Sequence, residues 1–152
     1  MKNVRDILRE KGTTVYSIGV RDSVFDALKL MADKNVGALL VFEADRLVGI
    51  ISERDYCRKG VLQHRLSKET LVREIMSEEI KTVTPAADLE QCMELFTEKH
   101  IRHLPVIEND RVVGIISIGD AVKGVIDHHE AVIEQLECYI KGQHAVGDKA
   151  KL

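Results

Sequence analysis

A serine and an aspartate stand three residues apart at two places in the chain, each time directly after an apolar run. The segments read RLVGIISERDYCR at 46–58 and RVVGIISIGDAVK at 111–123, and the pairs are Ser52 with Asp55 and Ser117 with Asp120. An ionised aspartate accepts hydrogen bonds through two oxygens, which suits the two adjacent hydroxyls of a ribose. The spacing is therefore compatible with two binding sites for a ribose-containing ligand.

The same spacing also has a purely structural explanation. The pattern S-x-x-[DE] before a helix is typical of a capping box, in which the two side chains bind backbone N–H groups of the first helical turn. Capping and ligand binding are compatible, because a helix start with free N–H groups also favours an anion such as phosphate. Both interpretations stay open for each motif.

The motifs lie in a longer internal repeat. A constant shift of 65 residues superposes residues 15–58 on residues 80–123 without a gap, which indicates that one ancestral unit was duplicated. In each copy, hydrophobic residues recur at i, i+3, i+4 and i+7, a spacing that predicts an amphipathic helix. These residues are Val24, Ala27, Leu28 and Met31 in the first copy and Leu89, Cys92, Met93 and Phe96 in the second. The candidate N-caps are Asp22 or Ser23, and Asp88.

Short apolar runs predict the strands of each copy. They cover residues 15–18 and 80–83 before the helices, 38–42 and 103–107 after them, and 47–52 and 112–117 beyond the hairpin turns EADR and ENDR. A further helix opens at Glu53 or Ile118. The helical crossover makes the first two strands parallel and the tight turn makes the third antiparallel, so each copy is a β-α-β-β-α unit.

A unit of about 60 residues is marginally stable alone, so we expect an α/β (α+β) fold in which two units pack sheet to sheet about a pseudo-twofold axis. This packing would create two equivalent clefts. The predicted segments are a first domain at 1–65, a second at 66–127 and a C-terminal helical tail at 128–152, with lead-in helices at 4–8 and 72–76 and a linker at 60–71. Apolar residues of the tail helix need a surface to cover them, which predicts a homodimer.

Composition excludes several classes of protein. The 152 residues carry 22 basic and 25 acidic side chains and a formal charge of -3, so no overall basic field attracts nucleic acid or acidic lipid. Cys57, Cys92 and Cys138 form neither a CxxC pair nor a disulfide framework, and we expect reduced thiols. The N-terminus lacks an apolar signal region and no run is long enough to span a bilayer, which predicts a cytoplasmic protein without a membrane partner.

These residues resemble a tandem pair of CBS domains (cystathionine-β-synthase-type), also called a Bateman module, over roughly residues 1–127. The resemblance rests on the lead-ins VRDI and VREI, the segment RHLPVIE and the motif G-h-h-S-x-x-D, which occurs twice in full. ISERDY, together with a tail containing YIKG, resembles small stand-alone CBS-pair proteins. The resemblance implies that Asp55 and Asp120 hold ribose, that the neighbouring serines help to hold ribose or phosphate, and that each cleft is completed by the other copy.

Carried onto this sequence, the resemblance implies two chemically different clefts. The first cleft, expected to bind phosphate more tightly, combines Ser52, Arg54, Asp55, Ile80, Lys81, Ile101, Arg102 and His103. The second combines Thr14, Val15, Tyr16, Val36, Gly37, Ala38, Ser117 and Asp120, and has Gly119 where the first has Arg54. A solvated surface is the alternative explanation for the basic residues of the first cleft.

Other kinds of site find less support. His100 with His103, or the run Asp127-His128-His129-Glu130, lack the further ligands of a tetrahedral metal site, so no metal is expected. No nucleophile motif or P-loop is present, and Cys92 lies on an apolar helix face, so catalysis and a catalytic cofactor are not expected. Gly49 and Gly114 indicate close backbone approach within a strand.

The sequence thus predicts a regulatory module, not an enzyme, that senses an adenosine-containing ligand for an unknown regulated protein. The expected ligand is AMP or another adenine nucleotide such as ADP or ATP, with NAD(H) or S-adenosylmethionine as further adenosyl compounds. The alternative is a structural or oligomerising protein whose clefts no longer bind a ligand.

Overall fold

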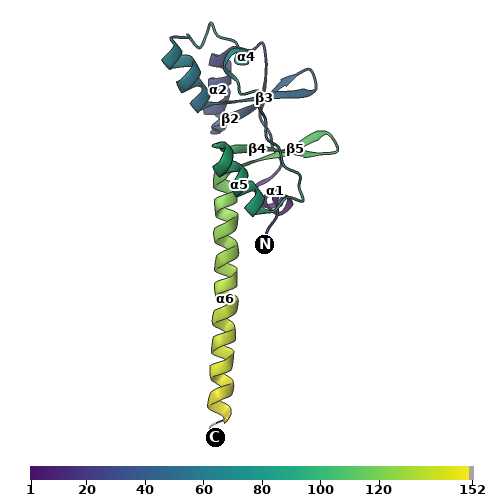
Figure 1. The fold of residues 1–152 in the computed structure, drawn as a ribbon, viewed down its shortest axis with the longest axis vertical. Helices are drawn as coiled ribbons and strands as arrows, with labels where there is room; N and C mark the ends of the chain where they lie inside the picture. The colour runs from purple at the N-terminus through teal and green to yellow at the C-terminus, as the bar shows by residue number, and fades with distance from the viewer. Residues whose placement is uncertain (151–152) are drawn as a thin grey trace.

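The computed structural model describes residues 1–150, with side chains described up to residue 142. The regular elements are α1 (Val4–Lys11), β1 (Ser17–Gly19), α2 (Val24–Lys34), β2 (Ala38–Glu43), β3 (Arg46–Ser52), α3 (Glu53–Asp55), a π-helical turn (Tyr56–Gly60), a 3₁₀ turn (Val61–Gln63), α4 (Val72–Ile75), α5 (Leu89–Lys99), β4 (His103–Glu108), β5 (Arg111–Ser117) and α6 (Ile118–Ala150). Figure 1 shows the two copies one above the other, with α6 extending away from both. The predicted mixed α/β fold with a C-terminal helix is confirmed.

The first copy forms the predicted β-α-β-β sheet. Strand β1 pairs with β2 in parallel and β2 pairs with β3 antiparallel. Helix α2 begins after the N-cap Ser23, whose side chain accepts a hydrogen bond from the backbone N–H of Asp26. It ends at Asn35, which has a left-handed conformation with φ of 53° and directs the chain into β2. Asparagine is one of the few residues that adopt this conformation readily.

The second copy departs from the prediction at residues 80–83, which do not form a strand. Only Val83 joins the sheet, through a bridge to Val106, beside the antiparallel pair β4 and β5. In the first copy the N–H of Leu40 donates to the carbonyl of Tyr16 over 3.2 Å. The repeat places Pro105 at the position of Leu40, and proline has no N–H to donate. The loss of this donor explains why the predicted strand is reduced to one bridge.

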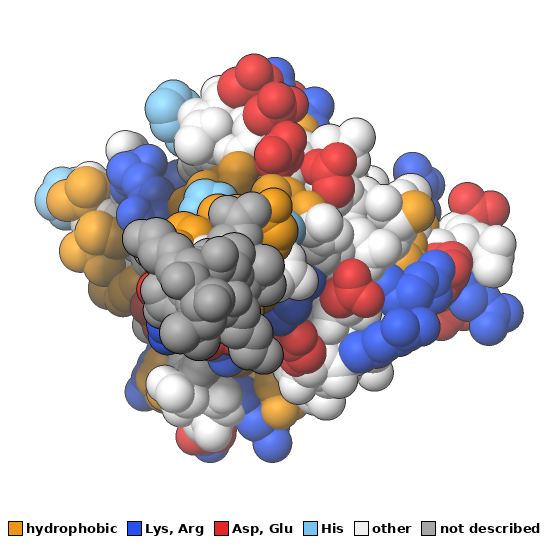
Figure 2. Space-filling model, turned by 90° about the horizontal axis from the view of Figure 1, so that it is seen from below, with side chains coloured by type: hydrophobic (Ala, Val, Ile, Leu, Met, Phe, Trp, Pro, Cys, Tyr) orange, Lys and Arg blue, Asp and Glu red, His pale blue; other side chains and the backbone are white. Residues whose placement is uncertain are grey.

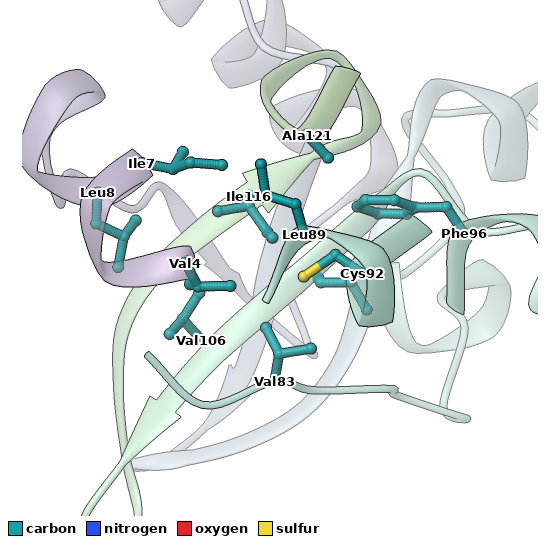
Figure 3. Packing of buried hydrophobic residues seen from close by; sticks show 11 residues of the cluster. Val4, Ile7, Leu8, Val83, Leu89, Cys92, Phe96, Val106, Ile116 and Ala121 are labelled. Carbon is teal, nitrogen blue, oxygen red and sulfur yellow. The ribbon is translucent and has the colours of Figure 1, made fainter. Parts of the chain in front are cut away.

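The short lead-in helices are exchanged between the copies. Val4, Ile7 and Leu8 of α1 pack in the buried cluster of the second copy, against residues such as Leu89 and Ile116. Figure 3 shows these three side chains pointing from α1 into that cluster. Helix α4 contributes in the same way to the first copy, where Val72 and Ile75 pack with residues of α2, β2 and β3. Each core therefore needs a helix from the other half of the sequence.

The predicted close approach at two glycines is confirmed and explained by these helices. A Cβ atom built at Gly114 would lie 2.7 Å from Cδ2 of Leu8, one of the buried residues of α1. A Cβ atom at Gly49 would lie 2.7 Å from Sδ of Met76, directly after α4. A side chain at either position would have to displace its neighbour. The glycines thus allow the exchanged helices to lie directly on β3 and β5.

The last helix is longer than the pattern predicted. The helix expected after Ser117 and the separate helical tail are one element, α6, with 33 residues and a length of about 50 Å. Its first turns pack against α5 and β5, where Ala121 and Gly124 are buried. Beyond residue 128 its described residues are exposed. Figure 2, which looks along this helix from below, shows both signs of charge spread over that face of the molecule.

Candidate ligand-binding cleft

Both Ser-x-x-Asp motifs form capping boxes at the ends of β3 and β5. The backbone N–H of Ser52 donates to Oδ2 of Asp55 over 2.9 Å, and the N–H of Asp55 donates to Oγ of Ser52 over 3.2 Å. In the second copy the N–H of Ser117 donates to Oδ2 of Asp120 over 2.8 Å, and the return bond to Oγ of Ser117 is 3.2 Å. The capping interpretation is confirmed for both motifs. These bonds hold each carboxylate at the exit of its strand.

A cavity of about 460 Å³ opens beside the first motif. Its wall contains the predicted residues Ser52, Arg54, Asp55, Lys81, Ile101, Arg102 and His103. The remaining wall residues are Gly37, Ile50, Glu53, Arg58, Lys59, Ser77, Glu79, Lys99 and His100. The motif of the first copy therefore faces the segment before β4 of the second copy, as the resemblance to CBS pairs implied. Ile80, which was predicted for this cleft, is not among the wall residues.

The wall of the Asp55 cavity is rich in positive charge. It carries six cationic side chains, from Arg54, Arg58, Lys59, Lys81, Lys99 and Arg102, and three acidic ones, from Glu53, Asp55 and Glu79. The whole chain has a formal charge of -3, so this site concentrates charge of the opposite sign. A cleft with an excess of one sign of charge attracts ligands of the other sign. The cavity is therefore suited to an anion.

Asp55 is held by a second set of contacts on its other oxygen. Oγ of Ser77 donates to Oδ1 of Asp55 over 3.2 Å, and Nζ of Lys59 lies 3.5 Å from the same oxygen. Lys59 also donates to the carbonyl of Ile75 over 3.3 Å. The donor nearest to Oδ1 is thus a neutral hydroxyl, which can rotate and can also accept a hydrogen bond.

His103 lies at the start of β4, where it is paired with Ser117 and also lines the Asp55 cavity. Burial lowers the pKa of its imidazole, and the positive charges of Lys11 and Arg102 lower it further, against an opposing effect of Asp120. The ring is therefore biased toward its neutral form. It stands next to residues of both motifs.

The second motif has a partner that the sequence did not reveal. Nζ of Lys11, the last residue of α1, donates to Oδ2 of Asp120 over 2.7 Å and to the carbonyl of Ile115 over 3.0 Å. Burial by itself would raise the pKa of Asp120, but the hydrogen bonds from Lys11 and from the N–H of Ser117 outweigh it, so the pKa is lowered. The cleft expected to lack cations thus contains one.

The other residues predicted for the second cleft have contacts within the first copy. Tyr16 and Val36 pack against its core, and Nζ of Lys34 lies 5.5 Å from the ring centre of Tyr16. Ala38 pairs with Ser52 across β2 and β3. Gly37 accepts a hydrogen bond from the N–H of Glu53 over 3.1 Å and also lines the Asp55 cavity. Thr14 and Val15 lie between α1 and β1.

Some residues of the Asp55 cavity outside the predicted set have a signal in the sequence. Arg58 and Lys59 follow Asp55 by three and four residues, a spacing that places them on one side of a helix. Lys99 and His100 directly precede the predicted residue Ile101. Lys11 had no such signal, because its contact with Asp120 depends on the packing of α1 on the second copy.

In the described part of the chain, no three His, Cys, Asp or Glu side chains are grouped so that they could hold a metal ion. The three cysteines are free thiols, and burial followed by the charge of Asp88 raises the pKa of Cys92 to about 11. Among the residues that the structure describes, no helix has both the length and the apolar character of a membrane span.

Comparison with known proteins agrees with the repeat and the fold. The family model "CBS domain" matches residues 4–61 and 72–127. The CBS domain-containing protein CBSX3 of Arabidopsis thaliana, named as mitochondrial, is 42% identical over 148 residues, which span 91% of this chain and 72% of that protein. The cytoplasmic location of this chain therefore stays a prediction.

Two solved structures extend the comparison. The crystal structure of a CBS domain, NE2398, has a TM-score of 0.79 and 48% identity, and the match covers 82% of this chain and 98% of that one. A hexameric CBS-CP12 protein from bloom-forming cyanobacteria has a TM-score of 0.71 and 31% identity, with 80% of this chain and 70% of that chain covered. With one family match on each copy of its repeat, the chain belongs to the CBS domain family and contains a tandem pair of CBS domains.

Proposed function

We propose that the chain is a regulatory module that senses an adenine nucleotide in the Asp55 cavity. CBS pairs are in general regulatory, nucleotide-sensing modules, and the relative CBSX3 is named as a CBS domain-containing protein. The observation that carries the proposal is one cavity of about 460 Å³ that combines the carboxylate of Asp55, which suits ribose hydroxyls, with six cationic side chains. This volume lies in the range of small-molecule sites, which is about 300–1,000 Å³.

Each part of a nucleotide has a complement in this cavity. The carboxylate of Asp55 and the hydroxyls of Ser52 and Ser77 suit the ribose hydroxyls. Arg54 and Arg102 suit the phosphates, because a guanidinium makes charge-assisted, often bidentate, hydrogen bonds to phosphate oxygens. Ile50 and Ile101 add apolar surface against which a base could pack. AMP, ADP and ATP therefore match the cavity better than a neutral adenosyl compound.

The alternative function is a structural or oligomerising protein with a cleft that no longer binds a ligand. In that case the Ser-x-x-Asp motifs would serve only as helix caps. The excess of cations around the cavity, six against three acidic side chains, argues against it. Lys59 and Lys81 lie 3.5 and 3.6 Å from carboxylates of Asp55 and Glu79, and the excess that is left repels itself unless an anion is bound.

We propose that the module acts as a homodimer, because α6 exposes an apolar stripe. Val122, Ile126, Ile133, Leu136 and Ile140 lie on one side of the helix and are each 40% or more exposed. The exposed tail is acidic, with Asp127, Glu130, Glu134 and Glu137 against Lys141. The first copy exposes Val61, Leu62 and Leu66 beside Arg65 and Lys68. Figure 1 shows α6 running away from the first copy, so a second chain has to supply this complement.

Thermal melting with and without AMP, ADP, ATP, NAD and S-adenosylmethionine tests the ligand proposal. A ligand at about 100 times its Kd adds roughly 2.7 kcal/mol to the free energy of unfolding. That corresponds to a rise of about 5 to 10 °C in Tm for a chain of this size. GMP at equal concentration separates adenine recognition from simple phosphate binding. If no adenosine compound raises Tm, the structural alternative becomes the better explanation.

A further inference from the structure

The two aspartates of the repeat meet different donors at the same place in the fold. In the first copy Ser77 supplies two of them: its N–H donates to the carbonyl of Ile50 over 2.8 Å and its hydroxyl donates to Asp55 over 3.2 Å. The repeat places Ile115 and Asp120 at the positions of Ile50 and Asp55. In the second copy the ammonium of Lys11 donates to both of these groups, over 3.0 and 2.7 Å. One cation therefore binds the two groups that the neutral donors of Ser77 bind in the first copy. It binds Oδ2 of Asp120, the oxygen that also accepts from the N–H of Ser117, whereas Ser77 binds Oδ1 of Asp55.

Lys11 reaches this place because α1 is a full turn longer than α4. The lead-in helices have 8 and 4 residues, and Lys11 ends the additional turn. The helix is fixed on the second copy by buried Val4, Ile7 and Leu8. The stem of Lys11 therefore starts from a rigid element, and its contact with Asp120 is set by the packing of the core.

The two kinds of donor differ in how readily a ribose displaces them. On Asp55 a ribose hydroxyl would replace the neutral hydroxyl of Ser77 on Oδ1, and the ammonium of Lys59 lies farther from that oxygen, at 3.5 Å. On Asp120 a ribose hydroxyl would have to compete with an ammonium at 2.7 Å, and a hydrogen bond between two ionised groups is stronger than one with a neutral donor. Both side chains of this pair are largely shielded, with 34% and 24% exposed, so solvent screens the attraction only in part.

We propose that Lys11 is a specificity-determining residue that closes the Asp120 cleft to ribose, so that each chain carries one nucleotide, in the Asp55 cavity. This inference rests on the proposed function. It also assigns a role to the longer lead-in helix. Because of its extra turn, one of the two duplicated motifs forms a binding site and the other forms an internal ion pair.

The number of ADP molecules bound per chain, measured by isothermal titration calorimetry and native mass spectrometry, tests the inference. We expect one ADP per chain for the wild type and two for Lys11→Met, which keeps the length of the side chain and removes the charge. Lys11→Arg keeps the ion pair and should bind one. Arg9→Met, on the same helix with a side chain 73% exposed, is the matched control and should also bind one. Asp120→Ala combined with Lys11→Met should return the number to one.

Three outcomes would overturn the inference while leaving the proposed function intact. They are two ADP per wild-type chain, a folded Lys11→Met variant that still binds one, or a second site in Lys11→Met that persists without Asp120. If Lys11→Met does not fold, as judged by circular dichroism, Lys11→Gln makes the same test with a polar neutral side chain. Failure of the proposed function looks different, because then neither the wild type nor any variant binds ADP.

Discussion

Leu8 occupies the space above Gly114 that a side chain at this position would need. A Cβ atom at Gly114 would lie 2.7 Å from Cδ2 of Leu8. The two residues come from opposite ends of the sequence, and their contact holds the first helix on the sheet of the second CBS domain. The stability of the second domain therefore depends on residues at the start of the first.

Substitution of Gly114 by alanine should destabilise the protein. The added methyl group has to displace Leu8 or α1, and overpacking of this kind costs about 1–3 kcal/mol. Each kcal/mol lowers Tm by about 2–4 °C for a chain of this length. Combined with Leu8→Ala, the same substitution should cost less, because the methyl group then has room. Additive changes in Tm for the two substitutions would contradict the contact.

The aspartates of the two motifs should contribute unequally to nucleotide binding. Asp55→Ala should weaken AMP binding by about tenfold or more, since each 1.4 kcal/mol is a factor of ten in affinity. Asp120→Ala is a matched control, because both substitutions remove a capping box of the same geometry. Calorimetric titration decides between them. If Asp120→Ala abolishes AMP binding and Asp55→Ala does not, the nucleotide lies in the other cleft.

The cations of the cavity should matter in proportion to their contact with phosphate. Arg54→Ala or Arg102→Ala should weaken ATP binding by about tenfold, because hydrogen bonds to charged groups contribute roughly 1.5–3 kcal/mol. Arg46→Ala removes the same charge at the exposed start of β3 and should leave the affinity unchanged. An equal loss in all three variants would indicate a general effect of charge and not a contact with phosphate.

Protonation of His103 should make the fold sensitive to acid. Its pKa is lowered in the folded chain, so below the ordinary value of about 6.5 the unfolded chain binds more protons than the folded one. The free energy of unfolding should therefore fall as the pH drops from about 7 through this window. Between pH 7.5 and about 5.5, the Tm of the His103→Gln variant should fall less than the Tm of the wild type. His64→Asn, at an exposed left-handed position, is the control and should follow the wild type.

Cysteine reactivity should separate the three thiols. Cys57 and Cys138 are exposed, whereas Cys92 is buried with a pKa raised to about 11, and only a thiolate reacts readily. A disulfide reagent at pH 8 should modify two thiols per folded chain quickly and the third only in denaturant. A variant with both Cys57→Ser and Cys138→Ser should react slowly over the whole time course as long as it is folded. Rapid modification of three thiols in the wild type would show that the core opens easily.

The apolar stripe of α6 should hold two chains together. Ile133→Lys places a charge in the stripe at a side chain that is 53% exposed in the single chain, so the fold itself should not suffer. Analytical ultracentrifugation should then give a monomer where the wild type gives a dimer. Gln135→Lys adds the same charge outside the stripe and should leave the dimer intact. A wild type that is monomeric at micromolar concentration would refute the homodimer.

The sequence by itself determined the elements whose causes are local. The helix faces beginning at Val24 and Leu89, the caps Ser23 and Asp88, and both capping boxes follow from spacing and side-chain chemistry. The resemblance to CBS pairs implied that the motif of one copy faces the other copy, and Asp55 and Arg102 do line the same cavity. The prediction of a strand at 80–83 was wrong, because only Val83 joins the sheet. The reason, Pro105, which lacks an N–H, is visible in the sequence.

Only the tertiary structure decided which residues complete each cleft. Gly37 was assigned to the second cleft and lies in the wall of the first, because the turn before β2 backs the helix start of its own copy. Lys11 reaches Asp120 because α1 packs on the domain that follows it by more than sixty residues. Contacts between distant segments depend on the geometry of a packed core, and apolar periodicity carries no information about which core a helix joins.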